Sequence, residues 1–232
     1  MGSQRISSST DFCIIIDKSI HNAYEHLEQE MTIANRTSPI EVDIGKGDVR
    51  TIQRGKTWAQ FEYLQKGFED TRGLKLCYYN GTIEILMPGA AHELFKKIIA
   101  ILIEVFLLDR QIEFEPTGSM TRKREGTAAA EADESYEIQG AKLCVEINFT
   151  SGDESKLLCY QELGVDEVWF WEDGVLAVYS LQSDGYQKVS RSQISALAAI
   201  DLTIMSECIL IGETSRIEAV NKFRQAHPIA SD

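Results

Sequence analysis

Basic residues and proline are scarce in this chain of 232 residues. Its 23 lysines and arginines are outnumbered by 36 aspartates and glutamates, so the net charge is -13 and the surface repels polyanions at long range. This balance excludes a protein that coats nucleic acid by electrostatic attraction, although it leaves room for a local basic groove. Only four residues are proline and no long low-complexity tract occurs, which favours a soluble globular protein.

Paired cysteines and long apolar runs are also missing. The five cysteines lie too far apart for a Cys-x-x-Cys pair, so a zinc site or disulfide framework is disfavoured and a reducing, cytoplasmic compartment is predicted. Residues 12–16 are apolar but are followed at once by Asp17 and Lys18, so no signal peptide is expected. The run from Leu94 to Leu108 is too short and too charged to cross a membrane.

The composition changes after the first fifty residues. Residues 1–50 are expected to form an N-terminal extension that is partly helical or disordered, with one short helix from Ser19 to Met31. Regular apolar periodicity begins at Thr57, so residues 51–232 are expected to form one domain that ends in a helix.

Periodicity and turn signals in this domain predict alternating helices and strands. Residues 117–138 look polar and irregular, apart from a probable strand that starts near Asp133. The predicted elements are a helix from Thr57, a hairpin over 74–88 around Asn80-Gly81, a helix over 91–108, strands over 112–115 and 143–149, a helix over 153–163, strands over 165–171 and 175–181, and helices over 195–200 and 213–226. This order predicts an α/β fold with flanking helices around a mixed central sheet. It includes a parallel crossover from Val145 through the 153–163 helix to Val168.

Two carboxylates stand in unusual surroundings. Asp133 lies at the start of a probable strand, and Glu146 interrupts an apolar strand. A buried carboxylate is costly unless it is paired, hydrogen-bonded or bound to a metal, so a structural salt bridge and a metal or catalytic site both stay open. If the two segments pair as neighbouring strands, the carboxylates converge, and two carboxylates with a backbone carbonyl suit Mg²⁺.

A lysine follows the second carboxylate at a distance. Lys156 lies in the first turn of the helix after the Glu146 strand, and the turn at Ser151-Gly152 is expected to fold it back toward the strand's end. There it could orient a water molecule and offset developing negative charge. The alternative is a solvated helical lysine. The basic run Arg122–Arg124 similarly either contacts phosphate or belongs to a solvated loop.

Several segments resemble the Uma family (Uma two) of restriction endonucleases, within the PD-(D/E)XK nuclease superfamily. They are ILMPGAAHE, EADESYEI, CVEINFTSG and KLLCYQELGVDEVWFWEDGVLAVYSL, and the resemblance covers about residues 55–185. Two positions depart from the superfamily pattern: Asn148 stands where the motif lysine belongs, and Ala132 stands where the motif proline belongs. The family carries its lysine on the following helix, which implies Lys156 as the counterpart.

The resemblance implies a restriction-endonuclease-like core and an endodeoxyribonuclease that depends on Mg²⁺ (or Mn²⁺). Asp133, Glu146 and the carbonyl of Ile147 would bind the metal, and Lys156 would position the attacking water. DNA is the implied partner, and cleavage of both strands makes a homodimer natural. A non-catalytic protein-interaction module that retains the nuclease fold is the alternative, which the acidic charge favours because DNA affinity rests largely on basic contacts to phosphate.

Two residues at the start of the long helix complete the implied site. His92 matches the family's histidine and would assist the metal, the water or the phosphate, with Glu93 as its neighbour. Both also have simpler roles open to them. His92 could satisfy a neighbouring carbonyl, and Glu93 could complement the positive end of the helix dipole.

Overall fold

The computed structural model describes residues 41–45, 47–148, 154–172 and 174–229. The predicted helix over 19–31 and the turn at 151–152 lie outside these residues. Every described element belongs to one compact unit, residues 39–232.

The described residues form two six-stranded sheets, where the sequence predicts one. The strands of the first sheet are β1 (Glu41–Gly45), β2 (Asp48–Gln53), β3 (Lys75–Tyr79), β4 (Thr82–Met87), β6 (Thr121–Arg124) and β7 (Ala128–Glu131). They lie in the order β1-β2-β4-β3-β7-β6, and every neighbouring pair is antiparallel. The second has the order β12-β11-β10-β9-β8-β5; its strands are β5 (Phe114–Pro116), β8 (Glu134–Ile138), β9 (Ala141–Asn148), β10 (Glu167–Glu172), β11 (Val175–Gln182) and β12 (Gly185–Val189). The class is therefore mixed α/β, as predicted.

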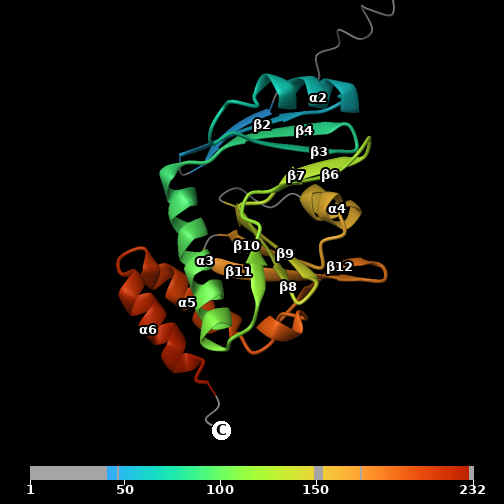
Figure 1. Cartoon of the computed structure of the whole chain (residues 1–232). Coiled ribbons are helices and arrows are strands. Elements are labelled where there is room, and N and C mark those ends of the chain that lie inside the picture. The colour runs from blue at the N-terminus through green and yellow to red at the C-terminus, as the bar shows by residue number, and fades with distance from the viewer. Residues whose placement is uncertain (1–40, 46, 149–153, 173, 230–232) are drawn as a thin grey trace, which may run out of the picture. The chain divides into compact units, whose positions relative to one another are not determined.

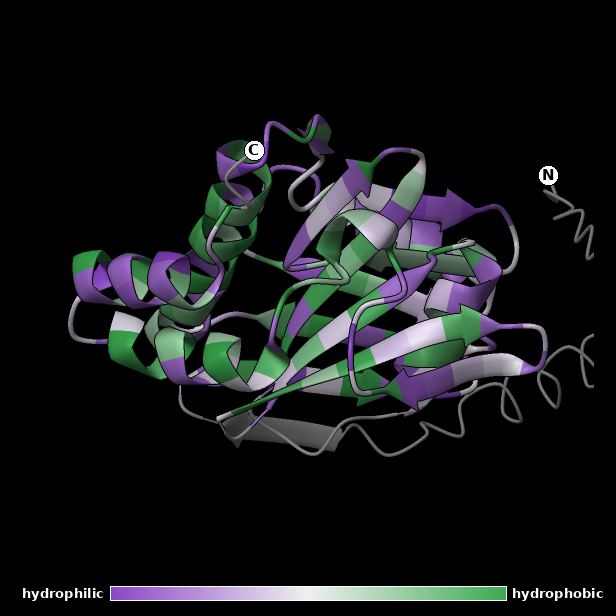
Figure 2. Cartoon of the chain, turned by 90° about the horizontal axis from the view of Figure 1, so that it is seen from below, coloured by the Kyte–Doolittle hydropathy of each residue, from purple (hydrophilic) through white to green (hydrophobic). Residues whose placement is uncertain are grey.

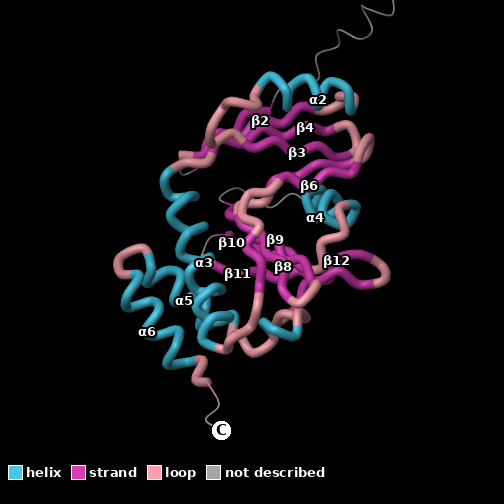
Figure 3. Tube along the Cα trace, in the orientation of Figure 1, coloured by secondary structure: helices cyan, strands magenta, loops and turns pink. Residues whose placement is uncertain are grey.

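Helices cover and separate the two sheets (Figure 1). The helix α2 lies on the outer face of the first sheet, and α4 lies between the sheets, where it contacts β3 and β7 of one and β12 of the other (Figure 3). The long helix α3 packs on the opposite face of the second sheet with α5 and α6. Their bounds are α2 Trp58–Gly67, α3 Ala90–Asp109, α4 Glu154–Glu162, α5 Leu202–Gly212 and α6 Arg216–Ala226, and a short 3₁₀ helix spans Ser195–Leu197.

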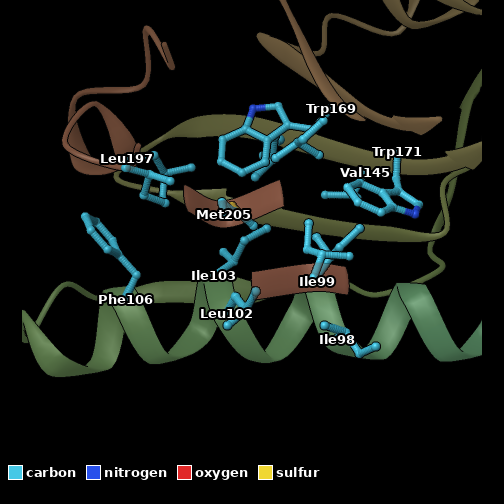
Figure 4. Close-up of a cluster of buried hydrophobic side chains, with 14 of the residues drawn as sticks. Ile98, Ile99, Leu102, Ile103, Phe106, Val145, Trp169, Trp171, Leu197 and Met205 are labelled. Carbon is cyan, nitrogen blue, oxygen red and sulfur yellow. The ribbon is translucent and has the colours of Figure 1, made fainter. Parts of the chain in front are cut away.

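The largest hydrophobic core lies between α3 and the second sheet. Ile99 and Ile103 of α3 face Trp169 and Trp171 of β10 across it (Figure 4). Both tryptophans are at most 1% exposed, so they are core residues. Hydrophobic residues lie along the inner strands, whereas hydrophilic residues gather in the connecting turns (Figure 2). No helix in the described part of the chain is long and apolar enough to span a bilayer.

Local sequence signals account for several elements that were predicted correctly. Thr57 caps α2 in a capping box with Gln60, which satisfies two free amide groups of the first turn. Asn80 and Gly81 both have positive φ (44° and 76°), as the two-residue hairpin between β3 and β4 requires. The crossover from β9 through α4 to β10 joins parallel strands, with Val145 opposite Trp169.

Two predictions of secondary structure in the domain were wrong. Residues 121–131, predicted as irregular, form the hairpin β6–β7, because β7 pairs with the distant strand β3 despite its alanine-rich sequence. The helix predicted over 195–200 is a single 3₁₀ turn, and the helix α5 that follows was missed because its apolar sequence has no clear periodicity. The boundary predicted at residue 50 falls within β2, whose residues pair with β4.

The functional side chains are positioned where the chain crosses from one sheet to the other. β7 ends at Glu131 in the first sheet and β8 begins at Glu134 in the second, so only Ala132 and Asp133 make the crossing. Beside it, Gly89 begins α3 in close contact with Gly47 of the β1–β2 turn. A Cβ atom on Gly89 would lie 2.6 Å from the carbonyl carbon of Gly47.

Gly89→Ala is expected to destabilise the protein by about 1–3 kcal/mol, because the added methyl group overlaps backbone that cannot move freely. Urea unfolding of the variant and wild type measures the difference. Gly67→Ala is the matched control, since a Cβ there meets nothing within 4 Å and alanine restricts the unfolded chain. Equal stabilities for Gly89→Ala and Gly67→Ala would contradict the close contact.

Candidate active site

Asp133 is completely buried at the crossing and is held from three elements. Its Oδ1 accepts a hydrogen bond from Lys75 Nζ of β3 at 2.5 Å and lies 2.8 Å from His92 Nε2 of α3. Its Oδ2 accepts the amide N–H of Ile147 in β9 at 2.6 Å. Burial opposes ionisation, but the His92 hydrogen bond and the Lys75 charge hold the pKa of Asp133 well below its usual range.

Glu146 is the second buried carboxylate, at 1% exposure. In β9, Val145 and Ile147 face the α3 core, so strand alternation directs Glu146 to the opposite face, beside α4. Lys156 Nζ donates to its Oε2 at 2.7 Å, and the hydroxyl of Tyr160 donates to its Oε1. Lys156 and Tyr160 are four residues apart on α4 and therefore share one helix face.

The pairing of β8 with β9 brings the two carboxylates together. Glu134 lies opposite Val145 in this antiparallel pair, and the N–H of Asp133 donates to the carbonyl of Val145 at 3.1 Å. The two segments are thus neighbours, which is the condition on which the predicted convergence of the carboxylates depends. Burial raises the pKa of Glu146, and the charge of Asp133 adds to this while Lys156 opposes it. The pKa values of the two acids therefore move in opposite directions.

His92 is fully buried in the first turn of α3, and both of its ring nitrogens face carboxylates. Nδ1 lies 2.9 Å from Asp48 Oδ2, and Nε2 lies 2.8 Å from Asp133 Oδ1. Burial alone would lower the pKa of His92, but these two acids raise it above its ordinary value. His92 therefore contacts the site through Asp133. The side chain of Glu93 is half exposed and pairs instead with Lys96 at 2.6 Å, in the first turn where an acid suits the helix dipole.

Three residues of the site were not predicted from the sequence. With Asp48, Lys75 and Tyr160 there are two sets of side-chain contacts, which adjoin along β9 where the Ile147 amide bonds Asp133. One set is Asp48, Lys75, His92 and Asp133, and the other is Glu146, Lys156 and Tyr160; together we call them the junction cluster. Tyr160 could have been found from its spacing to Lys156. Lys75 also donates to the carbonyl of Ala132 at 2.9 Å, but no sequence signal connects residues this far apart.

The carboxylate oxygens of the junction cluster decide whether a metal fits. Each oxygen offers about two acceptor positions. Asp133 Oδ1 accepts Lys75 Nζ and lies 2.8 Å from His92 Nε2, which crowds it from two sides, whereas Asp133 Oδ2 and both oxygens of Glu146 each accept one described hydrogen bond. These three hard oxygens are ligands of the kind that Mg²⁺ prefers. The described residues contain no group of three or more His, Cys, Asp or Glu side chains arranged to hold a metal, so waters would supply the other ligands.

Ile147 and the basic run Arg122–Arg124 make contacts other than those expected from the sequence. Ile147 reaches the cluster through its amide N–H, whereas the sequence predicts its carbonyl as a metal ligand. The basic run Arg122–Arg124 is strand β6 rather than a loop, and each of its residues lies near a carboxylate. The pairs are Arg122–Glu137 at 3.8 Å, Lys123–Glu62 at 3.1 Å and Arg124–Glu162 at 2.7 Å.

Lys156→Met is expected to destabilise the protein by about 3–5 kcal/mol, because it leaves the Glu146 carboxylate buried without its cation. Adding Glu146→Gln to this variant removes the uncompensated charge and is expected to restore much of the loss. Denaturant unfolding measures both effects. Lys222→Met is the matched control, since Lys222 pairs with Glu207 at the same 2.7 Å but in solvent, and little change is expected. An equal loss in both lysine variants would contradict the buried pair.

The lowered pKa of Asp133 predicts how stability depends on acid pH. The folded protein keeps this carboxylate ionised at pH values where the unfolded chain, with an ordinary pKa of 3.8, takes up a proton. The stabilisation is therefore complete above the unfolded value and is lost as the pH falls below it. In Asp133→Asn the free energy of unfolding is expected to fall less steeply between about pH 5 and pH 3 than in wild type. Equal slopes in urea titrations would overturn this.

No protein-family model matches the chain, and no curated protein matches it either. The function of the junction cluster therefore has to be inferred from its own residues.

Proposed function

We propose that this chain is a Mg²⁺-dependent endonuclease that hydrolyses DNA phosphodiester bonds, with the restriction-endonuclease-like core of the PD-(D/E)XK superfamily. The observation that supports the proposal is the burial of Asp133 and Glu146 on neighbouring segments, with Lys156 bonded to Glu146. The two acids come from neighbouring strands, and the lysine comes from the next helix and bonds the second acid. This is the arrangement that the resemblance to the Uma family implies, with Lys156 replacing the lysine absent at Asn148.

Each residue of the cluster has a chemical role in this proposal. Asp133 and Glu146 would hold Mg²⁺, which when bound polarises a phosphoryl oxygen and lowers the pKa of a coordinated water. Lys156 would orient the attacking water and offset negative charge on the phosphate. Tyr160 fixes Glu146 from its other oxygen, and His92 fixes Asp133, so both acids keep their orientation.

The exposure of the cluster indicates where a substrate would approach. The side chain of Lys156 is 17% exposed, whereas those of Asp133 and Glu146 are at most 2% exposed. A phosphate group would therefore arrive from the Lys156 side, next to the cation. Because hydrolysis of both strands of a duplex needs two such sites, the proposal includes a homodimer.

A non-catalytic interaction module is the second candidate, and one observation favours it. Both oxygens of Asp133 and both oxygens of Glu146 already accept hydrogen bonds from within the protein. A buried network of this kind can serve stability alone. The net charge of -13 and the carboxylates beside Arg122–Arg124 also weaken attraction to a polyanion.

Cleavage of supercoiled plasmid DNA in Mg²⁺ or Mn²⁺ tests the proposal. Wild type is expected to nick or linearise the plasmid, and EDTA is expected to abolish cleavage. The near-isosteric variants Asp133→Asn and Glu146→Gln are expected to lower the rate about 100-fold or more, because each removes an anionic ligand. Circular dichroism at the assay temperature checks that each variant is folded.

The matched control is Glu207→Gln, which removes an exposed carboxylate from an ion pair on α5. It is expected to cleave at the wild-type rate. Cleavage by wild type, Glu146→Gln and Glu207→Gln at one rate would mean that the activity comes from another source. Failure of wild type on duplex, single-stranded and branched DNA, with either metal, would favour the interaction module.

A further inference from the structure

Asp48 is a buried acid at the start of β2 that bonds two different parts of α3. Its Oδ1 accepts the amide N–H of Gly89 at 2.6 Å, and its Oδ2 lies 2.9 Å from Nδ1 of His92. One carboxylate therefore contacts both the first residue before the helix and the side chain three residues later. A charged group at 7% exposure is costly to bury, which makes its two bonds the natural reason for its presence.

The bond to Gly89 satisfies one amide at the helix start, that of the N-cap residue itself. Gly89 is the N-cap residue of α3 and has no side chain to satisfy the free amides of the first turn. Asp48 contributes a carboxylate there from another element, near the positive end of the helix dipole. The close approach of Gly47 to Gly89 fixes the turn before β2 against the helix start. The start of α3 is thus held against the β1–β2 turn and the first residue of β2, through Gly47 and Asp48.

The contact of Asp48 with His92 also affects Asp133, the proposed metal ligand, because His92 lies between the two acids. His92 is fully buried, and its other ring nitrogen lies 2.8 Å from Oδ1 of Asp133. The ring therefore has one acid on each side, and its plane is determined by both. The orientation of the Asp133 carboxylate in turn fixes Oδ2, the oxygen that accepts the amide of Ile147 and would be the metal ligand.

We propose that Asp48 is a positioning residue of the active site, which orients His92 and through it the carboxylate of Asp133. The chain of contacts runs from Asp48 to His92 to Asp133, with Lys75 as a second donor to the same oxygen of Asp133. Asp48 does not touch the metal or the substrate. The consequence for metal binding and cleavage rests on the proposed function, whereas the orientation of Asp133 does not.

Asp48→Asn separates the two bonds of this carboxylate. Asparagine keeps one carbonyl oxygen, which can still accept the Gly89 amide, but it presents an NH₂ group rather than an oxygen to His92. The variant is expected to melt close to wild type while losing the anionic acceptor for a ring N–H, so that only a neutral ring with its proton on Nε2 can still bond residue 48. Loss of such an outer partner typically weakens metal binding or activity about 10- to 100-fold. Asp48→Ala removes both bonds and is expected to lower the melting temperature as well.

The experiment compares wild type, Asp48→Asn and Thr57→Ala as full-length proteins. Thr57→Ala is the matched control, because it removes a helix cap on α2 without touching the junction cluster. Three readouts are taken: Mn²⁺ affinity by electron paramagnetic resonance, plasmid cleavage, and the ¹H–¹⁵N NMR signal of the Ile147 amide, which reports on Asp133 Oδ2. Asp48→Asn is expected to shift the Ile147 signal and to weaken Mn²⁺ binding about 10-fold or more, and Thr57→Ala is expected to do neither.

The readouts keep the two proposals apart. If wild type binds no Mn²⁺ and cleaves nothing, the proposed nuclease function fails, but a shifted Ile147 signal in Asp48→Asn alone still supports the positioning role. If Asp48→Asn leaves the Ile147 signal and the Mn²⁺ affinity of wild type unchanged, the positioning role is overturned. The same holds if Thr57→Ala changes these readouts as much as Asp48→Asn does, because the effect would then follow from stability alone.

Discussion

The hydrogen-bonded carboxylate of Asp133 is the interaction on which the two sheets of this protein depend. Only two residues connect β7 of the first sheet with β8 of the second, so the crossing has little backbone pairing of its own. Asp133 binds there to Lys75 from the first sheet, to Ile147 from the second and to His92 from α3. Burying the charge costs several kcal/mol, and the two hydrogen bonds from Lys75 and Ile147, with the close contact to His92, together offset that cost.

Charge balance explains why the junction cluster is stable inside an acidic protein. Of the cluster's three acids, Asp133 pairs with Lys75 and Glu146 pairs with Lys156. His92 lies between Asp48 and Asp133. The raised pKa of His92 and the lowered pKa of Asp133 have the same origin, because each group favours the charged form of the other. The net charge of the whole chain therefore says little about the electrostatics of this site.

The sequence predicted elements whose signals are local and missed those whose causes are distant. The start of α2 at Thr57 and the Asn80-Gly81 turn are decided within a few residues, and both were predicted. Strand β7 is alanine-rich and exists because β3 pairs with it, which no local pattern reveals. The same distinction applies to the site. Glu146 stood out because carboxylates are rare in apolar strands, but Lys75 is an ordinary strand residue until its partner 58 positions later is known.

Stability and metal binding make opposite demands on this cluster. Every internal donor that holds Asp133 or Glu146 in place also occupies a lone pair that a cation would use. Asp133 Oδ1, with two donors, contributes orientation, and Asp133 Oδ2 and the Glu146 oxygens are left as possible ligands. Because the Lys156 side chain is more exposed than that of Glu146, a cation that approaches from solvent would meet this ion pair first. A nuclease built on this cluster would thus give up part of a buried ion pair when it binds metal, whereas an interaction module would keep the pair intact.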